Sequence, residues 1–520
     1  MDFDTIQVLI AMICYMVIVI GIGVFYMKRS NQNSEEFFLG GRSLGPWVAA
    51  FSAEASDMSG WLLMGLPGVA YWCGLADAFW TAFGLAIGTY LNWLIVAKRL
   101  RGYSVVADNA ITLPDFFSNR FRENKKVLMM ISSIFILVFF TVYASSCFVT
   151  CGKLFSTLFG LKYVYMMIAG AIFVLVYTYL GGFLAESASD FMQAIVMILA
   201  LCTVLICGVS AAGGLDVVIE NAKSIPGYLE FFGIASPEVV DGVQQVNGIQ
   251  PLFGAAGTYG FLSVLSTMAW GLGYFGMPQV LLRFMAIRKP EELKKSRRIA
   301  VIWVVISLVA AVLIGIVGRA LYPTALQTAS DAENIFIVLG TKLLPPLLAG
   351  LIMAGILAAT ISSSDSYLLI AASALSKNIY QGIVKKEATD KQVMNMSRLT
   401  LVVISIIGVL IAMDENSVIF KIVSFAWAGF GATFGPVLLF SLFWKRINRK
   451  GAIAGMLSGG IMVFVWKLCL KPMGGVWGIY ELLPAFIVSC IVIIIVSLLT
   501  PEPSEQLNQD FDAAKNYNGL

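Results

Sequence analysis

Long apolar runs separated by short polar segments make up most of this sequence. A helix needs about 20 apolar residues to cross the hydrocarbon core of a membrane. Windows of about 19 residues predict helices near residues 5–27, 45–73, 75–97, 127–158, 163–183, 190–213, 254–286, 299–321, 342–378, 399–413, 418–444, 451–470 and 476–499. The pattern predicts an all-α integral membrane protein with about thirteen transmembrane helices. A barrel would show alternating strands of about ten residues instead.

The positively charged loop segments fall on one side of these helices. They are 28–29, 98–101, 120–126, 288–298, 377–398 and 445–450. Because cytoplasmic loops of membrane proteins are enriched in Lys and Arg, we expect the N-terminus outside and the C-terminus in the cytoplasm. The formal net charge of +4 follows from this orientation signal, and we expect no nucleic-acid partner.

Composition narrows the function classes further. The chain is 59% hydrophobic and 13% charged, whereas a soluble domain is roughly one quarter charged. It has no His, which removes the most common proton relay and transition-metal ligand. The eight Cys lack the paired spacing of zinc or redox motifs, so we expect them to be small buried hydrophobic residues. No basic residue precedes the first apolar run, so we expect that run to be a retained helix and not a signal peptide.

The second predicted helix carries two acids at its midpoint, within the segment SAEASDMSGW at 52–61. An ionisable residue at that depth is costly and is by default a functional-site hypothesis. Asp57 is the first candidate. Glycines and a proline follow it, so this helix is expected to break near its middle.

The seventh predicted helix is interrupted in a similar way, by Gly271, Gly273, Gly276 and Pro278. Two interrupted membrane helices in corresponding halves of a chain indicate an inverted-repeat transporter with its site at the membrane midplane. The alternative is that Gly and Pro are simply common in membrane helices.

The ninth predicted helix holds a dense polar cluster in the segment ILAATISSSDSYLL. Hard cations prefer oxygen ligands, and a broken helix frees backbone carbonyls. We therefore expect a sodium site built from the carbonyls of Ala55, Met58 and Ala359 and the hydroxyls of Ser362 and Ser363. Asp57 would add charge or order the break; the alternative is that it caps the second half-helix.

Trp270, Tyr274 and Pro278 follow one another at intervals of four residues and therefore lie near one face of a helix. This stripe is consistent with the lining of a small apolar pocket. Packing against a neighbouring helix or lipid is the alternative.

Several long segments resemble the sodium:solute symporter family, and within it the bacterial sodium/proline symporters. They are GGRSLGP (40–46), SAEASDMSGWLLMGLPG (52–68), LPDFF (113–117), YLGGFLAESASDFMQA (179–194), WGLGYFGMPQVLLRFMA (270–286), ILAATISSS (356–364) and AWAGFGATFGPVLLFSLFWKR (426–446). The resemblance extends over essentially all predicted helices.

The resemblance implies a LeuT-like core of two inverted five-helix repeats, with one extra helix before it and two after it. We expect a first helix and cytoplasmic loop at 1–44, repeats at 45–214 and 254–446, and the last two helices at 447–500. The polar segment 215–253 is expected to be an external loop with a short surface helix. The polar segment 501–520 is expected to be a disordered cytoplasmic tail.

The resemblance also implies roles for individual residues. It assigns proline binding to Ser59, Gly60, Trp61, Tyr143, Trp270, Tyr274 and Pro278, and sodium binding to Ala55, Met58, Ala359, Ser362 and Ser363, with Asp57 required for coupling. Arg42 and Asp190 match charged positions at the inner end of the pathway. Ser363 stands where proline symporters often have Thr. Asp365 and Ser366 resemble relatives that bind a second sodium with an Asp at the position of Asp190, which leaves one or two sodium ions open.

The leading hypothesis is uptake of L-proline across a bacterial-type cytoplasmic membrane, driven by inward sodium movement and alternating access. The nearest alternative is a sodium symporter of this family for another amino acid, pantothenate or a monocarboxylate. Proton coupling through Asp57, Glu186 or Asp190 is less favoured without His. We expect no enzyme, because no Gly-x-Ser-x-Gly or similar arrangement occurs, and no obligate protein partner; the other partner is membrane lipid.

Overall fold

The computed structural model describes residues 3–30 and 34–517, and nearly all of its regular structure is helical. The first half contains α1 (Phe3–Ser30), α2 (Ser34–Leu39), η1 (Gly40–Arg42), α3 (Pro46–Gly60), η2 (Trp61–Gly65), α4 (Leu66–Cys73), α5 (Leu75–Leu91), η3 (Asn92–Val96), α6 (Ala97–Val106), α7 (Leu113–Arg120), α8 (Val127–Phe159), α9 (Tyr163–Ala211) and α10 (Leu215–Lys223). The expected all-α fold class is confirmed.

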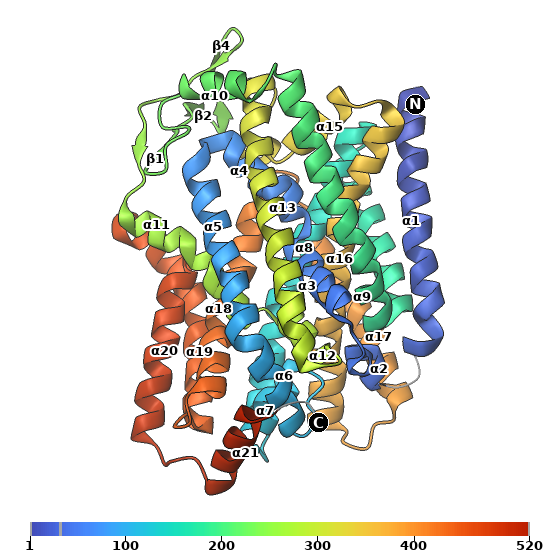
Figure 1. Cartoon of the computed structure of the whole chain (residues 1–520), viewed down its shortest axis with the longest axis vertical. Coiled ribbons are helices and arrows are strands. Elements are labelled where there is room, and N and C mark those ends of the chain that lie inside the picture. The colour runs from blue at the N-terminus through green and yellow to red at the C-terminus, as the bar shows by residue number, and fades with distance from the viewer. Residues whose placement is uncertain (1–2, 31–33, 518–520) are drawn as a thin grey trace.

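The second half is built in the same way. It contains α11 (Phe261–Met268), η4 (Ala269–Gly276), α12 (Pro278–Ala286), η5 (Pro290–Glu292), α13 (Leu293–Leu321), α14 (Ala329–Ala332), α15 (Ile335–Leu343), α16 (Pro346–Ser373), η6 (Ala374–Val384), α17 (Asp390–Ile411), α18 (Ile419–Phe443), α19 (Arg449–Val465), η7 (Trp466–Leu470), η8 (Lys471–Met473), η9 (Gly475–Gly478), α20 (Leu482–Leu499) and α21 (Glu505–Lys515). Figure 1 shows the long helices running side by side along the vertical axis.

Ten helices of the described part are long and apolar enough to cross a membrane, so the chain is a multi-pass membrane protein. The other three predicted spans are 45–73, 163–183 and 254–286. They fall on the interrupted pair α3 and α4 and on the shorter apolar helices Tyr163–Tyr179 and Phe261–Gly276. The count of thirteen therefore stays a prediction.

The polar segment between the two halves forms a small structured cap. After α10, six two-residue strands pair antiparallel as three separate ladders: β1 (Gly233–Ile234) with β6 (Gly257–Thr258), β2 (Val239–Val240) with β3 (Val243–Gln244), and β4 (Val246–Asn247) with β5 (Gln250–Pro251). Figure 1 shows this cap at the top of the molecule, at the end where α1 begins, while α21 lies at the bottom. α10 is the short surface helix that the sequence predicts.

The polar composition of 501–520 predicts a disordered tail, but residues 501–517 contain a docked helix, and 518–520 lie outside the described residues. Glu505–Lys515 forms α21, which packs against α6. Its Phe511 is buried beneath the guanidinium of Arg99, with 4.9 Å from the guanidinium carbon to the ring centre. Asp510 accepts a hydrogen bond of 2.7 Å from Arg122. The prediction was wrong because the docking surface is made by residues far away in the sequence.

Two membrane helices are interrupted where the sequence predicts it. Ser59 takes a backbone conformation (φ 48°, ψ −171°) that ends regular α-helix, and the π-helical stretch η2 follows. The seventh predicted span winds tightly as η4, becomes extended at Met277, and resumes at Pro278 as α12. Proline suits that first helical position because it has no amide hydrogen to leave unpaired.

A third interruption lies inside α9, which contains two of the predicted membrane spans. Gly182 lies in the left-handed region (φ 67°) within α9. Glycine carries no steric penalty there. The break accounts for the two separate spans predicted at 163–183 and 190–213.

The polar ninth span lies at the centre of the molecule. α16 packs against α1, α3, α8 and α9, and from Ile352 to Ser373 every residue is buried. Its serines therefore face neighbouring helices and not lipid. This arrangement brings them beside the break in α3.

Candidate functional site

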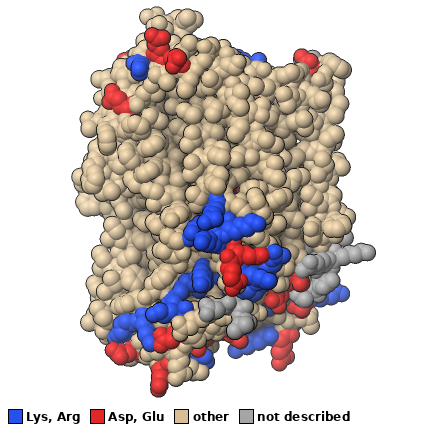
Figure 2. Space-filling view, viewed as in Figure 1, with Lys and Arg blue, Asp and Glu red and all other residues tan. Residues whose placement is uncertain are grey.

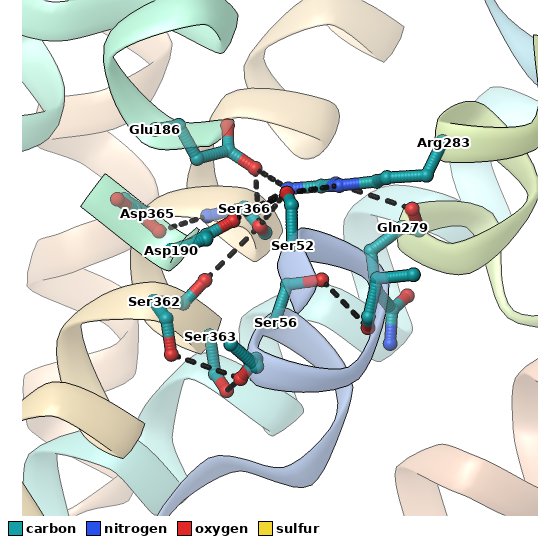
Figure 3. Close-up of polar contacts among 12 residues, drawn as sticks. Ser52, Ser56, Glu186, Asp190, Gln279, Arg283, Ser362, Ser363, Asp365 and Ser366 are labelled. Atoms are coloured by element: carbon teal, nitrogen blue, oxygen red, sulfur yellow. Dashed lines mark hydrogen bonds and ion pairs between the residues drawn. The ribbon is translucent and has the colours of Figure 1, made fainter. Parts of the chain in front are cut away.

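The turn of α3 that precedes its break faces the serines of α16 (Figure 3). Ser362 Oγ donates to the Ala55 carbonyl at 2.9 Å and is 3.2 Å from the Ala359 carbonyl, and Ser363 Oγ donates to the Ala55 carbonyl at 3.3 Å. Four of the five residues expected at a sodium site are thus brought together. Their oxygens are uncharged and buried, a donor set that suits a monovalent hard cation.

Met58, the fifth residue, is placed differently. It is buried at the end of α3, and its carbonyl accepts the backbone amide of Trp61. That hydrogen bond spans the break at Ser59. The Met58 carbonyl is therefore engaged across the interruption and makes no hydrogen bond to α16 within the described part of the chain.

Asp57 points toward the other interrupted helix. Its Oδ1 accepts a hydrogen bond of 3.3 Å from Gln279 Nε2 of α12, and its backbone carbonyl lies 3.4 Å from the hydroxyl of Tyr143 and 3.5 Å from that of Tyr367. The carboxyl is buried. Asp57 thus links the two interrupted helices, in addition to lying at the end of α3.

Aromatic rings pack together beyond the break. The Trp61 and Trp270 ring centres lie 5.5 Å apart, and Phe420 lies 5.9 Å from Trp61 and 5.2 Å from Trp270. Tyr480 stacks on Trp270 at 5.3 Å. Trp270, Phe420 and Tyr480 also line a cavity of about 770 Å³ on the side of the cap. The rings of Trp270, Phe420 and Tyr480 thus form the part of the cavity wall that lies next to Trp61.

Two further residues expected to bind substrate, Tyr274 and Pro278, lie near this aromatic group. Tyr274 meets Trp427 edge to face at 5.1 Å, and Trp427 Nε1 donates to the Trp270 carbonyl at 2.8 Å. Pro278 is buried as the first residue of α12. The stripe predicted from Trp270, Tyr274 and Pro278 is not one regular helical face, because η4 is wound as a 3-10 helix and the chain becomes extended at Met277.

Ser59, Gly60 and Tyr143 surround the break itself. Ser59 Oγ accepts the amide of Trp61 at 3.2 Å. A Cβ on Gly60 would lie 2.5 Å from the Thr150 side chain, so a side chain at Gly60 would clash with α8. Tyr143 stacks on Tyr367 with 4.2 Å between ring centres. Tyr367 therefore joins the site, where sequence reasoning placed it only within the polar cluster.

A buried ion-pair cluster adjoins the serines (Figure 3). Arg283 of α12 pairs with Glu186 and, at 3.1 Å, with Asp190. Its Nε donates to Ser52 Oγ at 3.0 Å, and one of its terminal nitrogens donates to Ser366 Oγ at 3.0 Å. Arg283 is completely buried. It therefore connects α12 to α3, α9 and α16.

Sequence reasoning missed Arg283, Ser52 and Gln279 and treated Glu186 only as a group that could titrate. One signal was available, because an arginine within a predicted membrane span is itself a functional-site hypothesis. The pairing with acids about a hundred residues away in the sequence could not be read from the chain. The order of the helices in space had to be known first.

The residues expected at a second sodium site belong to this cluster. Asp190 accepts a hydrogen bond of 2.7 Å from the Ser52 hydroxyl. Asp365 Oδ1 accepts a hydrogen bond of 2.8 Å from the backbone amide of Ser366. Ser366 also donates to Glu186. The guanidinium of Arg283 thus already places one positive charge among these acids.

Arg42 lies apart from Asp190, at the end of the molecule that carries α21. It donates to the Met285 carbonyl at 2.6 Å, to the Ala110 carbonyl at 2.8 Å and to Asn109 Oδ1 at 3.0 Å. Burial lowers the pKa of Arg42 to about 10, so its charge persists at neutral pH. Arg42 holds the last turn of α12 to the loop after α6, while Asp190 contacts the same helix through Arg283.

Comparison with known proteins shows the family of this chain. The model of the sodium:solute symporter family matches residues 37–459. The sodium/proline symporters of Staphylococcus aureus strains USA300 / TCH1516 and JH9 are each 40% identical over 516 residues, covering 98% of this chain and 96% of the relative. The range of the family model includes every residue expected to bind sodium or substrate.

Solved structures show the same fold. A sodium-coupled sialic acid symporter in a substrate-bound, outward-open state has a TM-score of 0.77 at 17% identity, covering 97% of this chain and 99% of that chain. A nucleobase-cation-symport-1 family transporter in a closed conformation has a TM-score of 0.52 at 11% identity, covering 93% and 100%. The match of the family model, the relatives at 40% identity and the shared fold lead to one conclusion. This chain belongs to the sodium:solute symporter family and is a transporter, not an enzyme.

Proposed function

We propose that this protein takes up L-proline together with sodium by alternating access. The identity of 40% to sodium/proline symporters over nearly the whole chain is the observation that carries the choice of solute. The meeting of the Ala55 carbonyl with Ser362 and Ser363 supports the choice of ion. An uncharged oxygen cage between an interrupted helix and a continuous one suits a transported monovalent cation.

We place sodium between α3 and α16, on the carbonyls of Ala55 and Ala359 and the hydroxyls of Ser362 and Ser363. Each serine hydroxyl now donates toward a carbonyl, so ion binding would turn its oxygen lone pairs toward the ion instead. The ion would hold α3 against α16. Met58 would join the set through a shift of its carbonyl away from Trp61, and Asp57 would stabilise the break without touching the ion.

Proline would bind at the break, between Ser59, Gly60 and Tyr143 on one side and Trp61, Trp270, Tyr274 and Pro278 on the other. Trp61 Nε1 is buried without a hydrogen-bond partner in the described residues and can donate to a carboxylate. The aromatic rings offer an apolar surface to the pyrrolidine ring. An ordered break is what both ligands require, so each raises the affinity for the other.

The membrane orientation belongs to the same proposal. An N-terminus outside and a cytoplasmic C-terminus would put the β-strand cap and the cavity above Trp270 on the external side. It would put α21 and Arg42 in the cytoplasm. Figure 2 shows Lys and Arg gathered over the lower part of the molecule, which supports this direction under the positive-inside rule. The repeats would extend over residues 45–214 and 254–446.

The test is flux of radiolabelled proline into proteoliposomes. We expect uptake to follow an imposed inward sodium gradient and to stop when the gradient is removed. Uptake that follows a proton gradient at constant sodium would contradict sodium coupling. Sodium-driven uptake of labelled pantothenate, lactate or another amino acid, with no uptake of labelled proline, would contradict the choice of solute and leave the sodium coupling standing.

A further inference from the structure

A small basic cavity lies between two membrane helices at the end of the molecule that carries α21. It has a volume of about 380 Å³, and its lining includes Lys98 at the start of α6 and Lys294 and Arg297 in the first turns of α13. Leu94 and Pro290 contribute apolar lining. The three cations come from two helices that are far apart in the sequence.

Within residues 3–30 and 34–517, these three cations have no protein counter-ion. The described part of the chain offers no carboxylate within ion-pair distance of Lys98, Lys294 or Arg297, although Glu291 also lines the cavity. The neighbouring Arg288 does pair, with Glu292 at 2.8 Å. Three positive charges against one negative charge leave an excess of two in the cavity, which selects an anion.

The surface above the cavity is apolar and exposed. On α13, Ile302 is 61% exposed and Val309 53% exposed, and beside it on α5 and η3 Tyr90 and Leu94 are also exposed. Figure 2 shows basic side chains low on the visible face, with a broad surface free of charge above them. The guanidinium carbon of Arg297 lies 5.7 Å from the centre of the Tyr90 ring. Its charge therefore lies at the edge of this exposed apolar surface.

We propose that this cavity binds the phosphate of an anionic phospholipid, with the acyl chains on the exposed apolar surface of α13 and α5. Basic cavities between membrane helices recognise anionic head groups by charge. A phosphate here would bridge Lys98 on α6 to Lys294 and Arg297 on α13. Under the orientation proposed above, the lipid comes from the cytoplasmic leaflet, but its binding does not depend on which solute is transported.

The test measures the affinity of the purified full-length protein, in detergent, for fluorescent phosphatidylglycerol. The site variant combines Lys98→Gln, Lys294→Gln and Arg297→Gln. We expect its affinity for phosphatidylglycerol to fall at least about tenfold, since each basic residue near a membrane surface contributes to anionic lipid binding. Phosphatidylcholine of the same chain length serves as the uncharged comparison and should bind wild type as weakly as it binds the variant.

The control variant removes the same charge elsewhere on the same end of the molecule. Lys385, Lys386 and Lys391 are exposed, and changing all three to Gln should leave lipid affinity near that of wild type. Equal loss in both triple variants would overturn the site, because net charge alone would then explain binding. Displacement of the lipid by millimolar inorganic phosphate would overturn it in favour of a soluble anion. A matching thermal unfolding midpoint for the two variants without lipid shows that the site variant is folded.

Discussion

At the scale of single residues, the contacts of Asp57 indicate its role. Asp57 was singled out from the sequence because an acid inside a membrane is costly. In the structure its carboxyl contacts Gln279 of α12 and not the serines of α16. We therefore propose that Asp57 sets the geometry of the break in α3. The hydroxyls of Ser362 and Ser363 donate to the Ala55 carbonyl, and under the proposed function they contact the ion.

Replacing Asp57 by Ala should therefore impair sodium activation more than proline binding. We expect the sodium concentration for half-maximal proline uptake to rise about tenfold or more, within the range of typical coupling energies. Sodium activation curves in vesicles at saturating proline measure this. Trp270→Ala is the comparison, and it should raise the apparent proline constant and leave the sodium constant nearly unchanged. Unaltered sodium dependence in Asp57→Ala would remove the basis for its assigned role.

Arg283 matters at the same scale, because it is the buried cation among several acids. Replacing it with Met leaves Glu186 and Asp190 without their counter-ion, and breaking a buried ion pair in this way costs about 3–5 kcal/mol. We expect a marked fall in the thermal unfolding midpoint of the purified protein. Adding Glu186→Gln to Arg283→Met should recover part of the loss. If the double variant were less stable than the single one, the ion pair would not explain the effect.

Helices in this protein approach one another closely where glycines face each other. α5 crosses η4 at Gly84, Gly88 and Gly271, where a Cβ on Gly88 would lie 2.3 Å from the Gly271 carbonyl oxygen. Small residues allow such backbone contact in membrane helices. The crossing positions η4 and therefore Trp270 and Tyr274.

Gly88→Ala should consequently disturb the crossing of α5 with η4. Overpacking of this kind costs about 1–3 kcal/mol, and we expect a lower unfolding midpoint together with reduced proline uptake. Gly21→Ala is the matched control, because no atom lies within 4 Å of a Cβ built at Gly21. Its stability and uptake should equal those of wild type. A neutral Gly88→Ala variant would show that the crossing tolerates displacement.

The two ends of the whole molecule differ in charge and in structure. The β-strand cap and α10 lie at one end, while α21 and the basic surface lie at the other (Figures 1 and 2). Acidic residues of α21 pair with Arg122 and Lys445. α21 thus ties the loop after α7 to the loop after α18.

Single cysteines test the orientation of the whole molecule. In a variant without its native cysteines, Ile249→Cys in the cap, where Ile249 is 82% exposed, should react with a membrane-impermeant maleimide in right-side-out vesicles. Lys386→Cys, at the opposite end, should react only after the vesicles are opened. The reverse labelling pattern would show that the N-terminus lies in the cytoplasm.

The sequence alone determined what depends on local chemistry and on the membrane as solvent. Apolar runs determined the helical class, and glycines and prolines such as Gly60, Gly276 and Pro278 marked the interruptions. Family motifs located Ser362 and Ser363. Only the tertiary structure decided which groups meet: the Ala55 carbonyl with α16, Asp57 with Gln279, Arg283 with two acids of α9, and Phe511 with Arg99. These contacts join residues far apart in the chain, and no local pattern specifies a pairing that depends on how helices are ordered in space.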